Sequence, residues 1–216
     1  MKFIPNSIHY WLRLTIIVLY VSGVYGCNFA FNYVPMDKSQ LHGSGKIFFI
    51  PITDFPVSEL QPLADYYRSK YGLEIEVKPN LRVTSTQYDS NRQQFIAEEL
   101  VALMRRTYPA LDEAGKAVLV GVIGEDMYIR KMNWHYAFAY RRDDDRAAVV
   151  SSARMNYGFL SLWQASKETQ ESRLRKMITK NIGVLYYHLP LSNNPKSVMY
   201  GRVGGPQELD RMGEDF

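Results

Sequence analysis

The chain has 216 residues, of which 46% are hydrophobic and 22% charged, and this is enough for one sizeable core. Because Cys27 is the only cysteine, a disulfide scaffold and any zinc or iron–sulfur site built from several cysteines are excluded. The first 26 residues hold Lys2, Arg13 and no acid, so the remainder has 24 basic and 22 acidic residues and a net charge of +2. This nearly neutral charge of the remainder argues against nucleic acid as a partner.

The N-terminus has the layout of an export signal. Two positive charges precede Leu14–Tyr25, an apolar run of 12 residues that ends in small residues beside Gly26. Twelve helical residues reach only about 18 Å, well short of the roughly 30 Å hydrocarbon core, so a permanent membrane span is the less favoured alternative. We therefore predict that residues 1–26 are a signal peptide and that the protein is exported to a bacterial cell envelope.

Cys27 lies directly after this apolar run. The string Val24-Tyr25-Gly26-Cys27 resembles the bacterial lipobox, in which the cysteine becomes the lipidated first residue of the mature protein. Tyr25 stands where a small residue is usual, which leaves simple secretion as the alternative. We predict lipid on Cys27 as the membrane contact of the protein.

A folded domain is expected over residues 46–216. Residues 27–45 mix aromatic residues with Pro, Gly and Ser and show no sustained period, which indicates a tether. Beyond them, apolar residues with strand and helix periods alternate, which indicates an α/β domain. The predicted strands are Ile47–Ile52, Leu73–Val77, Ala117–Ile123, Trp134–Tyr140 and Ala147–Ser151. The predicted helices are Val57–Tyr71 (ended by Gly72), Phe95–Met104, Glu168–Tyr187 and Gln207–Met212.

Five strings in this domain, in the expected order, resemble the archaemetzincins, a family of zinc-dependent metallopeptidases in the metzincin group. They are Tyr88–Phe95, Gly121–Tyr128, Trp134–Tyr140 followed by Ala148–Met155, Ser197–Met199, and Glu208–Arg211. The resemblance implies a single domain with a twisted mixed β-sheet, flanking helices and a central zinc-binding helix. It also makes Met199 the methionine of a Met-turn.

The zinc-binding motif of the family is degenerate in this chain. A family member would read H-E-x-x-H-x-x-G-x-x-H, with the third His after a glycine bend. Alignment through Gly183 puts Lys176, Met177, Lys180 and Tyr186 at the four catalytic positions. A protonated lysine has no lone pair for a cation, and methionine cannot take a proton from water. The family's further zinc-binding cysteines are also missing, so we predict no catalytic residue, no bound metal and no cofactor.

The resemblance and the degenerate motif together predict a catalytically inactive domain with a binding or structural role. The former cleft would take a peptide or protein ligand, for which Trp134, Tyr136 and Tyr140 offer an edge strand, although ordinary sheet packing is the favoured explanation for these three residues. The alternative is an active zinc metallopeptidase with ligands from outside the usual helix. His188, with the distant His42 and His135, is the source of such ligands.

Lys176 and Lys180 lie four residues apart on one face of the predicted helix. Two like charges at this spacing cost about 0.2–0.5 kcal/mol on an exposed helix and more if buried. We expect a solvated surface pair, because lysines are seldom fully buried. The alternative is that the pair presents positive charge where zinc once lay and binds a carboxylate.

Overall fold

The computed structural model describes residues 35–112, 116–157 and 164–216. The chain divides into two units, residues 1–32 and 33–216, and all described residues belong to the second. The predicted signal peptide, its apolar run and Cys27 therefore lie outside the described residues. Within these residues, no helix is both long enough and apolar enough to cross a membrane.

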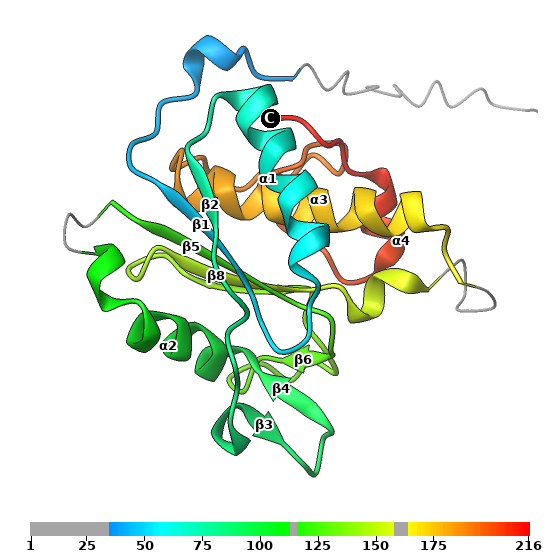
Figure 1. Ribbon diagram of the computed structural model, residues 1–216. Coiled ribbons are helices and arrows are strands. Elements are labelled where there is room, and N and C mark those ends of the chain that lie inside the picture. The colour runs from blue at the N-terminus through cyan, green and yellow to red at the C-terminus, as the bar shows by residue number, and fades with distance from the viewer. Residues whose placement is uncertain (1–34, 113–115, 158–163) are drawn as a thin grey trace, which may run out of the picture. The chain divides into compact units, whose positions relative to one another are not determined.

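A mixed five-stranded sheet forms the centre of the domain, with the strand order β2-β1-β5-β8-β7 (Figure 1). Four strands are parallel: β1 (Ile47–Pro51), β2 (Ile75–Val77), β5 (Val118–Ile123) and β8 (Ala147–Ser151). The fifth, β7 (Ala139–Arg142), runs antiparallel to β8 at the edge of the sheet. A second, three-stranded sheet contains β3 (Tyr88–Asp89), β4 (Gln94–Ile96) and β6 (Met127–Tyr128). The predicted α/β class and mixed sheet are confirmed.

Helices cover both faces of the five-stranded sheet (Figure 1). Helices α1 (Val57–Tyr71) and α3 (Lys167–Leu185) pack on the face that carries Phe49 and Val120. Helix α2 (Ala97–Thr107) packs on the opposite face, with Ile50 and Leu119. Side chains alternate across a sheet, so neighbouring residues of one strand enter the cores on opposite faces of the sheet. Because both faces are covered by helices, the central strands need continuous apolar sequences. The described residues also form α4 (Pro206–Arg211) and the 3-10 helices η1 (Lys38–Gln40), η2 (Ser85–Gln87), η3 (Pro109–Asp112) and η4 (Ala153–Asn156).

Helix α1 follows the sequence prediction at both ends. Its C-terminal neighbour Gly72 has φ +65° and donates its N–H to the carbonyl of Arg68. This left-handed conformation favours glycine and ends the helix there. Helix α2 begins two residues later than predicted, because Phe95 pairs in β4 with Met127 of β6.

The predicted strand Trp134–Tyr140 is mostly wrong, since only its last two residues belong to β7. Trp134 is instead 53% exposed. Side chains of the small sheet bind the backbone here: Arg92 donates to the carbonyls of Trp134 and His135, and Gln94 donates to that of His135. These bonds hold the segment in a loop, although its aromatic composition is typical of a strand.

Part of the expected tether packs on the domain. The N–H of Met36 donates to the carbonyl of Phe216 at 2.6 Å, and Lys38 Nζ donates to the carbonyl of Lys70. Leu41 packs against the core between the sheet and helices α1 and α3. The packed chain therefore begins before the predicted boundary at Lys46.

Candidate functional site on helix α3

Helix α3 carries the positions of the degenerate motif. Ser166 caps it by accepting the N–H of Thr169 at 3.2 Å, as a helix N-cap serine does. One side of the helix packs on the sheet through Ile178 and Ile182, both fully buried. On a second side, Tyr67 of α1 donates to the carbonyl of Arg175 at 2.9 Å. The helix is therefore an internal element of the domain.

Lys176 is buried, with 7% of its surface exposed. Its Nζ donates to the carbonyl of Leu209 in α4 at 2.9 Å. Burial lowers the pKa of Lys176, and the nearby carboxylates of Glu214 and Asp210 offset part of this effect. The prediction of a solvated lysine pair is wrong, because the C-terminal residues cover this part of α3.

Lys180 is buried more completely, with 5% exposed. Among the described residues, its Nζ has neither a hydrogen-bond acceptor nor a carboxylate partner. The charged group that acts on it is Arg141 of the edge strand β7, which is a like charge. Burial, with a smaller contribution from Arg141, lowers the pKa of Lys180 to about 8. A buried cation without a counter-ion is unusual in a folded protein.

The glycine bend of the family motif does not form at Gly183, in agreement with the helix predicted through this residue. The helix continues to Leu185, and the chain adopts a left-handed backbone only at His188, with φ +57°. Gly183 serves close packing instead, because a Cβ atom there would lie 2.5 Å from Sδ of Met199 and 2.7 Å from Cε1 of Phe216. Met199, in the predicted Met-turn, is thus in direct contact with the helix.

The aligned motif positions do not converge on one point. Tyr186 follows Lys176 by ten residues, which at about 100° per residue turns it roughly 80° away around the helix axis. Its ring is T-shaped against Tyr187 and lies beside Gly43. Met177 is 5% exposed and belongs to the apolar core.

These residues do not fit a zinc ion. In the described ranges, no group of three His, Cys, Asp or Glu residues is placed to hold a metal. His42, His135 and His188 thus form no three-ligand group with one another or with acids there. His188 lines a cavity of about 240 Å³ with Asp143, Val184, Leu185 and Leu189. A tetrahedral catalytic zinc needs three protein ligands, and these residues do not supply them.

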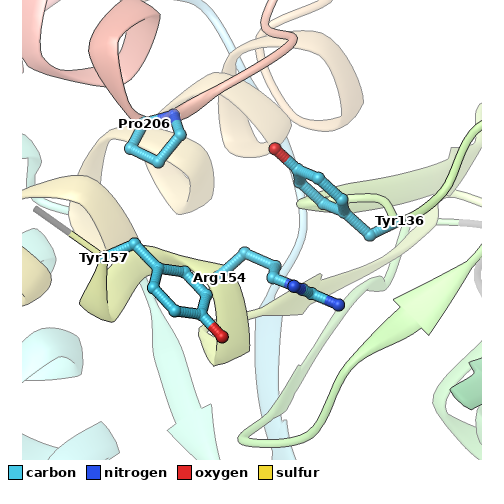
Figure 2. Close-up of a pocket in the computed structure, with 4 residues that line it drawn as sticks. All are labelled: Tyr136, Arg154, Tyr157 and Pro206. Carbon is cyan, nitrogen blue, oxygen red and sulfur yellow. The ribbon is translucent and has the colours of Figure 1, made fainter. Parts of the chain in front are cut away.

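A second cavity, of about 330 Å³, lies where three distant segments meet. Its walls are Tyr136 before β7, Arg154 of η4, Tyr157 and Pro206 at the start of α4 (Figure 2). Sequence reasoning proposed Tyr136 only for an edge strand and did not identify the other three as site residues. Arg154 lies within one of the family-like strings, but only the fold brings it to Tyr136.

The mixed sheet and the methionine packed against the long helix agree with the fold that the archaemetzincin resemblance implies. Curated archaemetzincins resemble the chain. The archaemetzincin of Natronomonas pharaonis is 24% identical over 138 residues, which cover 62% of this chain and 74% of the relative. That of Haloquadratum walsbyi is 25% identical over 154 residues, covering 69% and 83%. No protein-family model matches the chain.

Solved structures agree with this likeness. An archaemetzincin from Archaeoglobus fulgidus, complexed with malonate, has a TM-score of 0.63 at 23% identity, covering 80% of this chain and 95% of that one. A zinc-dependent peptidase from Methanocorpusculum labreanum has a TM-score of 0.64 at 20% identity, covering 79% and 95%. The chain therefore has an archaemetzincin-like fold.

Proposed function

We propose that the chain is an exported, lipid-anchored archaemetzincin-like domain that has lost its zinc peptidase site and keeps a binding role at the cell envelope. In this proposal residues 1–26 are a signal peptide, residues 27–45 a tether whose last part packs on the domain, and residues 46–216 the archaemetzincin-like domain. The domain is catalytically inactive, holds no cofactor, and has a peptide or protein ligand.

The burial of Lys180 is the observation that carries the loss of the zinc site. Lys180 stands at the aligned position of the second motif histidine, and it is 5% exposed beside the like charge of Arg141. A divalent cation at this point would add a third positive charge to a weakly solvated region, which is electrostatically unfavourable. The site is therefore unsuited to zinc by charge as well as by ligand type.

The continuation of α3 through Gly183 supports the same conclusion. The third motif ligand of the family follows a bend, but here Tyr186 is the C-cap residue directly after the helix and packs on Tyr187. A catalytic zinc ion is bound by three pre-arranged protein ligands, and its fourth position stays open for water or substrate. Substitution of single residues would not restore that arrangement, because the helix end itself has a different course.

We predict that the purified full-length protein contains less than about 0.1 zinc per chain after mild chelation and zinc replenishment. It should also cleave no unfolded protein substrate, and chelator should leave its thermal midpoint unchanged, because no metal contributes to folding. Elemental analysis, a casein digestion assay and thermal unfolding check these outcomes. Stoichiometric zinc or a large fall of the midpoint would support the alternative, an active peptidase with non-standard ligands.

The proposed export and anchoring lead to a separate prediction for Cys27. Its place directly after the apolar run of 12 residues predicts that the mature chain begins with a lipidated Cys27. Mass spectrometry of the protein from its native membrane should give the mass of the diacylglycerol-modified chain starting at this residue. Cys27→Ala should move the protein to the soluble fraction. An unmodified Cys27 would contradict the anchor while leaving simple secretion possible.

A further inference from the structure

The cavity between Tyr136, Arg154, Tyr157 and Pro206 combines a cation with aromatic walls. Figure 2 shows the side chain of Arg154 between the two tyrosine rings, with its guanidinium toward Tyr136 and Pro206 farther away. The Cζ atom of Arg154 lies 5.2 Å from the ring centroid of Tyr136 and 5.8 Å from that of Tyr157. Such distances allow cation–π attraction, so the rings hold the guanidinium between them.

Arg154 is held in place on one side and has free donors on the other. Its Nε and Nη2 both donate to Oδ2 of Asp126, an oxygen that also accepts from Gln94. Nη1 makes no hydrogen bond to a described residue. A guanidinium has five N–H donors, so three of those of Arg154 remain for a ligand. The side chain is 38% exposed, which keeps these donors accessible.

Hydrogen bonds to neighbouring elements also hold the two tyrosines of the cavity wall in place. Tyr136 Oη donates to the carbonyl of Gly204 at 3.1 Å, which joins the segment before β7 to the loop before α4. Arg173 of α3 donates to the carbonyl of Tyr157 at 2.7 Å. The aromatic walls therefore come from segments whose backbones are tied to neighbouring elements. A site arranged before binding loses little side-chain entropy when a ligand enters.

From this geometry we infer that the cavity binds a carboxylate attached to an apolar or aromatic group. The carboxylate meets the free N–H donors of Arg154, and the apolar part lies against Tyr157 and Pro206. Planar guanidinium groups recognise carboxylates by paired hydrogen bonds, and tyrosine and proline offer apolar contact area. The inference rests on the proposed binding role and gives it a ligand class, either the C-terminus of a peptide or a free small acid.

Calorimetric titration of the full-length protein with N-acetyl-phenylalanine and with its neutral amide tests the inference. The acid should bind at least about tenfold more tightly than the amide, because both have the same apolar part. Arg154→Gln should weaken binding of the acid about tenfold or more and leave the amide unchanged. The matched control Arg130→Gln, which changes an exposed arginine paired with Glu99, should bind like the wild type.

Two further measurements complete the test. Tyr157→Ala leaves the Arg154–Asp126 pair intact and should weaken binding several-fold, so it decides the question if Arg154→Gln does not fold. N-acetyl-trialanyl-phenylalanine should bind more tightly than N-acetyl-phenylalanine if the ligand is a peptide terminus, and equally if it is a free acid. Equal affinity for acid and amide, or unchanged binding in both cavity variants, would overturn the inference. Neither result bears on the zinc content that tests the loss of the peptidase site.

Discussion

Replacement of Lys180 by methionine is expected to stabilise the domain at neutral pH. Lys180 is 5% exposed, has no carboxylate partner among the described residues, and its pKa lies near 8 against an ordinary value of 10.5. The unfolded chain therefore binds the lysine proton more tightly than the folded domain does. At pH 7 this difference opposes folding by about 3 kcal/mol. Methionine has a similar length and no charge, so the variant avoids this cost.

The pH dependence of unfolding gives this prediction its sign. The pKa is lowered in the folded domain, so the destabilisation is fully present below pH 8 and disappears as the pH rises from about 8 to 10.5. Urea unfolding should show that Lys180→Met gains about 2–3 kcal/mol over the wild type at pH 7 and much less at pH 10. Lys131→Met, at an exposed position, is the control and should change stability by less than about 0.5 kcal/mol.

A lower stability of Lys180→Met than of the wild type at pH 7 would contradict this prediction. It would mean that the ammonium of Lys180 has an anionic partner in the folded protein. In that case the pKa of Lys180 in the folded protein would lie above its ordinary value of 10.5, and the wild type would lose stability only as the pH rises above that value, because deprotonation would break the pair. The direction of the pH dependence therefore separates a buried unpaired lysine from a buried ion pair.

Much of the fold could be predicted because its elements carry local signals. Helix α1 has apolar residues at helical spacing and a C-terminal glycine, and its predicted bounds are those of the structure. The central strand β5 is a continuous apolar run because both faces of the sheet are covered. The segment from Trp134 has a strand-like composition, but its course depends on side chains of Arg92 and Gln94, which are about 40 residues away. No local pattern contains that information.

The candidate site was predictable only in part. Alignment through Gly183 identified the helix and its degenerate positions, but the burial of Lys176 and Lys180 depends on elements that are distant in the sequence. The carbonyl of Leu209 in α4 accepts from Lys176, and Arg141 of β7 lies near Lys180. Surface lysines at i and i+4 are common, so the sequence favoured solvation. The cavity at Arg154 was not predicted, because its walls come together only when three segments meet. The Asp126–Arg154 pair joins two of the family-like strings, and nothing in either string alone indicates that contact.

Arg173→Met is expected to be the most destabilising single substitution among the predictions made for this protein. Arg173 is 3% exposed and joins three elements. Its Nε and Nη2 donate to the two carboxylate oxygens of Asp210 in α4, at 2.8 and 2.7 Å. Its Nη1 donates to the carbonyls of Met155 in η4, at 2.6 Å, and of Tyr157, at 2.7 Å. The Arg173 side chain therefore donates to all four of these oxygen atoms.

Methionine keeps most of the packing of Arg173 but removes all four hydrogen bonds. Breaking a buried charged pair by removing one partner costs about 3–5 kcal/mol, and because the Asp210 side chain is 45% exposed the lower value applies. We therefore expect a loss of about 3 kcal/mol in urea unfolding, with an intermediate loss for Arg173→Lys, whose ammonium cannot reproduce the two-pronged geometry of a guanidinium. The control Arg130→Met removes an exposed ion pair with Glu99 and should cost less than about 1 kcal/mol.

The same variant tests how far the C-terminal residues depend on α3. Loss of the Arg173–Asp210 pair should loosen α4 and the backbone of Tyr157, so amide exchange at residues 207–211 of α4 and at Tyr157 should accelerate before global unfolding. Exchange in α1, with which Arg173 makes no hydrogen bond or ion pair in the described part of the chain, should follow only the change in global stability. A stability loss below about 1 kcal/mol, or uniform acceleration across the domain, would show that α4 is held by its apolar contacts, chiefly the fully buried Leu209, and not by the ion pair.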